Sequence, residues 1–139
     1  MKILALDSSG LVASVALVED DILVAEYTMN YKKTHSQTLL PMLDEIKKAV
    51  NLDLESIDAI AVAAGPGSFT GLRIGSATAK GLGLALQKPL IGVPTVEALA
   101  YMSSSLPLDS GAAYLQQAFL YLCRPNCFCN TTMQSLHWA

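Results

Sequence analysis

Asp7, Ser8 and Ser9 are the first residues along the chain whose types could support chemistry, and they follow a short apolar run at residues 3–6. At the end of such a strand, backbone amides and hydroxyl groups can bind a phosphate while a carboxylate holds Mg²⁺ through water. The same residues, together with Gly10, also make an ordinary turn between two strands. Two interpretations of these residues therefore remain: a weak site for ATP with magnesium, or a turn that only connects two strands.

A second glycine-rich segment covers residues 65–73, with the sequence Gly-Pro-Gly-Ser-Phe-Thr-Gly-Leu-Arg. It lies between an expected buried strand and an expected helix, where the amides of a helix N-terminus can bind an anion. No lysine follows its last glycine and its spacing is not G-x-G-x-x-G, so it is not a Walker loop. The alternative is a rigid turn in which Ser68 or Thr70 caps the helix. Arg73 either meets a phosphate or a partner carboxylate, or makes a solvated ion pair.

Three glycines lie inside the helix expected at residues 70–86, namely Gly75, Gly81 and Gly83. Each costs about 1 kcal/mol relative to alanine, so this helix needs compensation from packing. Gly71, Gly75 and Ala79 recur every four residues and form a smooth strip that another backbone can approach closely. The strip packs either on the chain's own sheet or on a helix of another subunit. The composition, 52% hydrophobic and 15% charged, favours the second alternative.

Hydrophobic patterns predict the elements that position these residues. Apolar or alternating runs predict strands at residues 3–6, 12–18, 22–29, 57–63 and 90–93. Helical spacing predicts helices near residues 39–50, 70–86 and 95–102. The first three strands are expected to form an antiparallel meander. The order β-β-β-α-β-α-β-α predicts an α/β fold with a ribonuclease H-like mixed sheet, as in one lobe of the actin, sugar-kinase and heat-shock chaperone superfamily.

The first expected helix contains a proline. Its apolar residues recur at helical spacing: Leu39, Leu43, Ile46 and Val50. Thr34 and Gln37 match a capping box before it. Pro41 lies within the pattern, so the helix either kinks there or begins near it, and we expect the kink. His35 has no triad partner in reach and is expected to be a surface or capping residue.

The composition changes abruptly near residue 102, which predicts a domain at residues 1–102 and an atypical tail at 103–139. The first part holds eight Lys or Arg and eleven Asp or Glu, whereas the tail holds only Arg124 and Asp109. We expect the tail to be foreign to the domain and poorly ordered. A rival interpretation is a zinc site made by Cys123, Cys127, Cys129 and His137, whose spacing fits no familiar C-x-x-C pattern.

Bulk properties exclude several functional classes. The formal charge of −3 leaves no net positive field for nucleic acid, so contact with RNA is expected only through a partner. No apolar run reaches the roughly 18 residues of a membrane span, and no secretory signal precedes the first strand, so we expect a cytoplasmic protein. Residues 1–102 contain no cysteine, which excludes cysteine nucleophilic catalysis by this domain.

Four segments match the sequence of a known family: Ala-Leu-Asp-Ser-Ser at residues 5–9, His-Ser-Gln-Thr-Leu-Leu-Pro at 35–41, Ala-Gly-Pro-Gly-Ser-Phe-Thr-Gly-Leu-Arg-Ile-Gly at 64–75, and Lys-Pro-Leu-Ile-Gly-Val at 88–93. The family that they resemble is TsaB (YeaZ). The resemblance covers residues 1 to about 101 and lacks the second lobe of TsaB proteins. It implies a non-catalytic partner of TsaD, the enzyme that transfers threonylcarbamoyl to the tRNA adenosine beside the anticodon. It also implies TsaE as a further partner, homodimers through the same surface, and ATP with magnesium only as shared by the complex.

The resemblance also assigns residues. It implies a contact surface on the two long helices, made by Leu39, Leu43, Gly71, Arg73, Gly75 and Ala79. A bulky substitution, Gly75→Leu, is expected to wedge the paired helices apart. The two metal-binding histidines of the catalytic paralogue match Thr95 and Leu99, and leucine cannot bind a metal. We therefore expect no metal and no catalytic residue. The alternative from the enzyme class is an ATP-binding phosphotransferase or ATPase lobe that uses Asp7 with magnesium.

Overall fold

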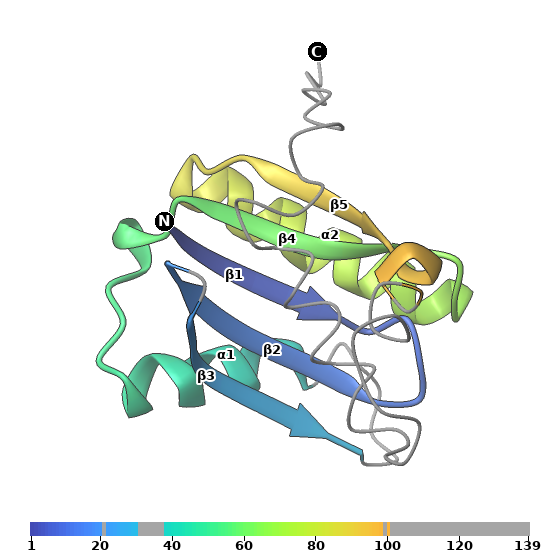
Figure 1. The fold of residues 1–139 in the computed structure, drawn as a ribbon, viewed down its shortest axis with the longest axis horizontal. Helices are drawn as coiled ribbons and strands as arrows, with labels where there is room; N and C mark the ends of the chain where they lie inside the picture. The colour runs from blue at the N-terminus through green and yellow to red at the C-terminus, as the bar shows by residue number, and fades with distance from the viewer. Residues whose placement is uncertain (21, 31–37, 99, 101–139) are drawn as a thin grey trace.

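The computed structural model describes residues 1–20, 22–30, 38–98 and 100 of the 139-residue chain. Five strands form one sheet in the order β3-β2-β1-β4-β5 (Figure 1). The strands are β1 (Lys2–Asp7), β2 (Ala13–Glu19), β3 (Ile22–Met29), β4 (Ala59–Gly65) and β5 (Leu90–Pro94). The helices are α1 (Leu39–Ala49), the short 3₁₀ helix η2 (Leu54–Ser56) and α2 (Phe69–Leu86).

The pairing of the strands confirms the predicted mixed sheet. β1, β2 and β3 form an antiparallel meander, whereas β4 and β5 run parallel to β1. Leu6 of β1, for example, pairs with Val15 on one side and Val62 on the other. Because β1, β4 and β5 are parallel, their carboxyl ends meet at one edge of the sheet. The turn after β1 and the start of α2 therefore lie next to each other.

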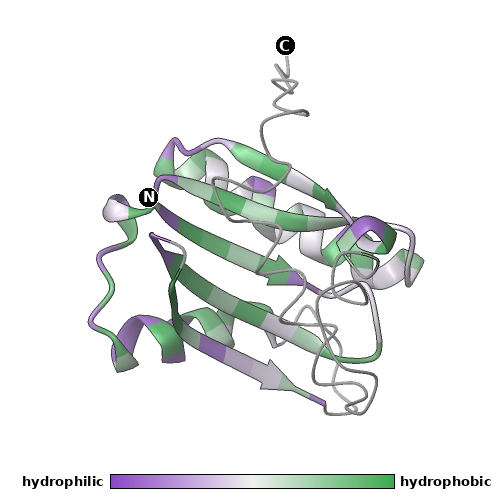
Figure 2. Ribbon diagram, in the orientation of Figure 1, coloured by the Kyte–Doolittle hydropathy of each residue, from purple (hydrophilic) through white to green (hydrophobic). Residues whose placement is uncertain are grey.

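Helices α1 and α2 cover the same face of the sheet, and α2 runs behind β4 and β5 in Figure 1. Helix α1 contributes its buried residues at helical spacing, as an amphipathic helix does. Figure 2 shows the hydrophobic residues concentrated along the central strands. The core on this face is made by Leu4, Leu6, Ala13, Val15, Leu17, Leu39, Met42, Leu43, Ile46, Leu52, Ile57, Ile60 and Ala79.

The opposite face of the sheet is lined by smaller side chains. Its buried residues are Ile3, Ala5, Ala16, Val18, Ala61, Ala63, Val93 and Ala98. Ala98 belongs to the helical stretch that follows β5, in which residues 95–98 and 100 are helical. The start of the predicted helix at 95–102 is therefore confirmed, and its end lies outside the described residues. β4 is buried from both sides, which explains its unbroken apolar sequence.

The predicted kink at Pro41 is wrong. Helix α1 begins at Leu39 with Thr38 as its N-cap, so Pro41 lies in the first helical turn. The first backbone N–H groups of a helix have no partner inside the helix, and the missing N–H of proline therefore costs nothing there. The alternative of a helix that begins near Pro41 is confirmed. Thr34, His35 and Gln37 lie outside the described residues, as do the four proposed zinc ligands and the whole predicted tail from 103.

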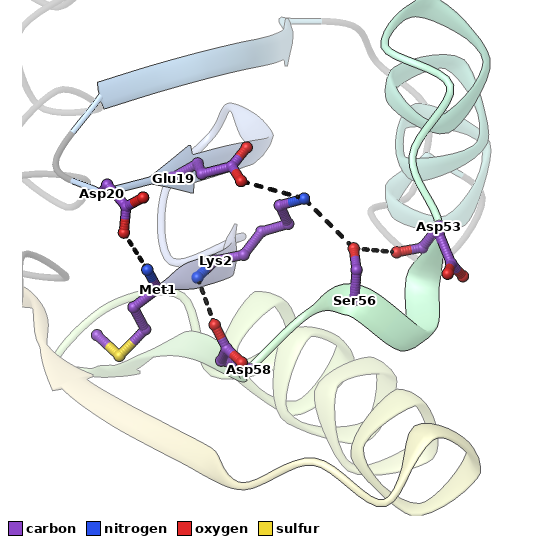
Figure 3. A network of polar contacts seen from close by, with 7 residues as sticks. All are labelled: Met1, Lys2, Glu19, Asp20, Asp53, Ser56 and Asp58. Carbon is purple, nitrogen blue, oxygen red and sulfur yellow. Dashed lines mark hydrogen bonds and ion pairs between the residues drawn. The ribbon is translucent and has the colours of Figure 1, made fainter.

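Polar contacts at the amino end of β1 connect it to its neighbours (Figure 3). The N-terminal ammonium of Met1 pairs with Asp20, which raises the pKa of that ammonium group. The backbone N–H of Lys2 donates to Asp58 Oδ2 at 2.7 Å, and Nζ of Lys2 lies 3.3 Å from Glu19 Oε1. These groups are mostly solvent-exposed, so their ion pairs contribute little to stability. The network lies at the end of β1 that is remote from Asp7.

Candidate functional site

The turn after β1 is fastened to the glycine-rich segment before α2. Ser8 Oγ donates a buried hydrogen bond to the carbonyl of Gly71, at 2.8 Å. The backbone N–H of Ser68 donates to the carbonyl of Ser9, at 2.7 Å. Ser9 donates its own N–H to Asp7 Oδ1, at 2.8 Å. The two segments that stood out in the sequence therefore form one hydrogen-bonded unit.

Glycine is required at positions 67 and 75 because the turn after β1 lies so close to the start of α2. A Cβ on Gly67 would lie 2.6 Å from the carbonyl oxygen of Ser9, and a Cβ on Gly75 would lie 2.5 Å from Ser8 Oγ. Both distances are far below van der Waals contact. Gly65 is required for a different reason, since its φ of 100° is a conformation that side chains disfavour. The glycines of this segment thus serve the internal packing of the lobe.

The start of α2 resolves the choice between two predicted caps. Ser68 is the N-cap, and its Oγ accepts a hydrogen bond from the N–H of Gly71 at 3.3 Å. Thr70 lies within the first turn of the helix and is exposed. The Gly65–Pro66 peptide bond before the cap is cis. The interpretation of this segment as a rigid turn with a serine cap is confirmed.

The residues that were predicted to bind a cofactor mostly make hydrogen bonds within the chain. The Ser8 hydroxyl donates to Gly71, the Ser9 amide donates to Asp7, and one oxygen of Asp7 is occupied by that bond. Ser8 and Ser9 are buried, while Asp7 is partly exposed. This arrangement is the side-chain-to-backbone turn that the sequence left open as an alternative. A role for these three residues in binding ATP with magnesium stays a prediction.

The predicted contact strip lies inside the lobe. Gly71, Gly75 and Ala79 are buried, and a Cβ on Gly75 would meet Ser8, in the turn after β1, and Val62 of β4. Leu39 and Leu43 are also buried, with exposed fractions of 1% and 5%. These five residues, predicted for a contact surface with a partner, therefore lie in the interior of the lobe, and the strip is smooth because α2 packs closely on β1 and β4. Gly75→Leu would disturb the lobe itself and cannot report on a partner.

The outer side of α2 carries an exposed stripe that sequence reasoning missed. Phe69 is 74% exposed and Leu84 is 84% exposed, and Arg73 and Ala77 lie between them on the same side. We call these four residues the outer stripe. Their spacing, opposite the glycine strip, is the signal that could have revealed them, because the glycines identify the inner face. Of the six predicted contact residues, only Arg73 lies on this surface.

Arg73 is oriented by its neighbour on the stripe. Its guanidinium carbon lies 5.4 Å from the centroid of the Phe69 ring, within the range of a cation–π contact. Residues four apart on a helix face each other, which explains the pairing. On α1, by comparison, Lys48 donates to Asp44 at 2.6 Å, and this bond raises the pKa of Lys48. The described residues offer Arg73 no carboxylate within ion-pair distance.

Other kinds of site are not found within the described ranges. No three His, Cys, Asp or Glu residues there are grouped in a way that could hold a metal ion. None of the helices in the same ranges is long and apolar enough to cross a membrane. Thr95 begins the helical stretch after β5, and its Oγ1 is buried without a hydrogen-bond partner among the described residues. Leu99, its counterpart in the predicted histidine pair, lies outside them.

Comparison with known proteins identifies the family. A family model described as TsaD: tRNA N6-adenosine threonylcarbamoyltransferase matches residues 23–111. The tRNA threonylcarbamoyladenosine biosynthesis protein TsaB of Escherichia coli strain K12 is 41% identical over 100 residues, covering 72% of this chain and 43% of that protein. The chain belongs to the TsaB (YeaZ) family. The solved structure of YeaZ from Pseudomonas aeruginosa agrees, with a TM-score of 0.66 and 35% identity over 74% of this chain and 49% of that one.

The match to TsaB proteins is partial in length. This chain spans less than half the length of the curated TsaB relatives, 43% and 44% for those of Escherichia coli and Bacillus subtilis. RuvC of Thermus thermophilus has a TM-score of 0.57 at 7% identity, over 87% of this chain and 90% of that one. At this identity the likeness shows the fold alone. The ribonuclease H-like α/β fold predicted for the TsaB lobe is therefore confirmed.

Proposed function

We propose that this chain acts in tRNA threonylcarbamoyladenosine biosynthesis as a non-catalytic partner of a TsaD-type enzyme, which it binds through the outer stripe of α2. The family membership supports the pathway. The observation that carries the binding role is the pair of large apolar side chains, Phe69 and Leu84, left exposed on one side of a helix. Exposed apolar side chains that share one helix face are typical of surfaces that bind a partner helix.

The non-catalytic part of the proposal is supported by the residues at the position of the transferase's metal ligands. Thr95 offers a hydroxyl group and Leu99 an alkyl group, where the resemblance implies two histidines. Neither group is an ordinary ligand for a transition metal. The Asp7 turn is also committed to internal hydrogen bonds. We therefore place the catalytic chemistry on the partner, with TsaE as a further component of the complex.

The proposal predicts that Leu84→Glu weakens binding to the TsaD-type enzyme of the same organism by at least about tenfold, because burial of one leucine contributes about 1.5–3 kcal/mol. Binding of the full chain would be measured by calorimetry with both purified proteins. Leu84 is 84% exposed in the lobe, so the substitution should leave the melting temperature unchanged.

Leu11→Glu provides the matched control. Leu11 is 91% exposed but lies in the turn between β1 and β2 and not on α2. The same chemical change there should alter affinity less than about twofold, within the range of ordinary surface substitutions. Equal loss in both variants, or no loss in either, would remove the outer stripe as the binding surface. A tRNA modification assay completes the test: the chain alone should form no product.

A further inference from the structure

The sheet face opposite α1 and α2 is apolar across four strands. One residue from each of β2, β1, β4 and β5 pairs in register with the next, and the row consists of Ala16, Ala5, Ala61 and Ile91. Ile3 and Val18 pair with each other in the next apolar row. The apolar surface ends at β3, where Glu26 is paired with Ala16, is exposed, and accepts a hydrogen bond from Thr28 at 3.0 Å.

A face of this width needs two helices to cover it. A helix with its side chains is about 10 Å across and neighbouring strands are about 4.8 Å apart, so one helix covers about two strands. On the other face, α1 packs on β2 and β3, while α2 packs on β4, β1 and β5. On the apolar face, the described residues provide one helical stretch, residues 95–98 and 100, which begins at the carboxyl end of β5 (Figure 1).

This helical stretch lies too close to β5 to cover β1 and β2. Ala98 comes four residues after Pro94, about 6 Å along a helix, whereas β2 lies three strand spacings, or about 14 Å, from β5. From α2, Leu72 reaches the same cluster, but beside Gly65 at the end of β4. The buried side chains on β1 and β2, which are Ile3, Ala5, Ala16 and Val18, therefore need a cover from outside the described residues.

The chain itself offers a segment of the right length and position. Residue 100 is the last described residue, it follows Ala98 on this face, and residues 101–139 come after it. Residues 101–111 could span up to about 36 Å if extended, which is more than enough to reach β1 and β2. Residues 112–122 contain no charged side chain, so their burial would leave no unpaired charge.

The sequence of this segment predicts a helix with one strongly apolar side. Asp109 and Ser110 are suited to cap its start, and Pro125 is expected to end it. Gln117 would lie on the side opposite Phe119. The apolar side would carry residues at helical spacing, namely Ala112, Leu115, Phe119 and Leu122.

We propose that residues 112–122 form a helix that packs on β1 and β2, on the sheet face opposite α1. Its large side chains, Leu115 and Phe119 among them, would lie against the small side chains of Ala5 and Ala16 and fill the space at the density of a protein interior. The inference goes beyond the proposed function, because it concerns the chain alone. It extends the domain into the tail that the change in composition predicted to be foreign and poorly ordered.

The test compares two buried alanines of β2 that lie on opposite faces of the sheet. Ala16 belongs to the apolar face, and Ala13 belongs to the core that includes α1. Each is replaced by cysteine in the full chain, after the native residues Cys123, Cys127 and Cys129 are changed to serine. The rate at which a thiol reagent labels the new cysteine under native conditions is then measured. Both thiols should react slowly, because both positions are covered.

Phe119→Asp should uncover one of these positions and not the other. The labelling rate of the Ala16→Cys thiol should rise at least about tenfold, and that of the Ala13→Cys thiol less than about twofold, because a charge at 119 opens only the apolar face. Gln117→Asp is the matched control, since it adds the same charge on the other side of the helix. It should change either rate less than about twofold. Phe119→Ala removes the ring without adding charge and decides the case if Phe119→Asp unfolds the whole chain.

Four results would overturn the inference. Fast labelling of the Ala16→Cys thiol before any change at 119 would show that the apolar face is open. Slow labelling that neither Phe119 variant accelerates would show that a different segment or molecule covers it. Protection that is lost on dilution of the protein would identify a second copy as the cover. Equal acceleration at both cysteines in Phe119→Ala would reject the assignment of residues 112–122 to one face.

Discussion

Gly75→Ala should destabilise the wild-type lobe and stabilise a lobe that carries Ser8→Ala. In the wild type, the new Cβ would lie 2.5 Å from Ser8 Oγ, whose position is set by its buried hydrogen bond to Gly71. Relief of this overlap requires Ser8 to rotate and lose the bond, and overpacking of this kind costs about 1–3 kcal/mol. Removal of Oγ leaves only ordinary contacts, 3.6 Å to Val62 and 3.8 Å to Ser8 Cβ.

Gly75→Ala should therefore lower the free energy of unfolding of the wild type and raise that of the Ser8→Ala variant. Without the overlap, alanine in a helix gains up to about 1 kcal/mol over glycine. Urea denaturation of the wild type, the two single variants and the double variant, followed by circular dichroism, gives the free energy of unfolding of each and the coupling between the two positions. Additive effects at Ser8 and Gly75 would contradict the packing described for α2. Ser8→Ala alone should cost about 0.5–1.5 kcal/mol, the usual contribution of one hydrogen bond.

Gly67→Ala should lower the free energy of unfolding by about 1–3 kcal/mol or more, because its Cβ would overlap backbone rather than a side chain alone. The added Cβ would lie 2.6 Å from the carbonyl oxygen of Ser9 and 2.8 Å from Ser9 Cβ. That carbonyl accepts the N–H of Ser68 at 2.7 Å, so movement of either segment breaks the connection between the β1 turn and α2. The loss would be measured by the same denaturation experiment.

Gly81→Ala is the matched control for Gly67→Ala. A Cβ on Gly81 would meet nothing within 4 Å, and the residue is exposed on α2. The substitution should raise the free energy of unfolding by about 0.5–1 kcal/mol, from helix propensity alone. The two glycine substitutions should thus have opposite signs. A loss of stability in Gly81→Ala, or no loss in Gly67→Ala, would show that the room for a Cβ atom does not decide how these positions respond to alanine.

Both predictions depend on packing inside one lobe, and they give the serines of the β1 turn a structural role. Ser8 and Ser9 contribute a hydroxyl and a carbonyl that hold α2 at a short distance from the sheet. The outer stripe is presented on the other side of the same helix. The turn therefore positions the proposed binding surface, and a substitution at Ser8 is expected to weaken partner binding without any contact to the partner.

Much of the fold follows from local sequence patterns. The strand predicted at 22–29 has the bounds of β3, and α2 begins one residue before its predicted start. Apolar runs of about four to eight residues between turn residues favour strands, because a helix of a globular protein needs about ten or more. Pro41 is the exception, since periodicity alone does not show where the first turn of a helix lies.

The elements, their order, the mixed sheet and the family can all be predicted before any coordinates are known, because they depend on patterns of neighbouring residues and on a specific motif at 64–75. The side of α2 that faces the sheet cannot be predicted in this way. A smooth strip of glycine and alanine suits a strand or a partner helix equally well, and helical spacing says only that Gly71, Gly75 and Ala79 share a side. Contacts between Ser8 and Gly75, which are distant in the chain, fix the inner side of the helix and leave Phe69, Arg73 and Leu84 on the surface.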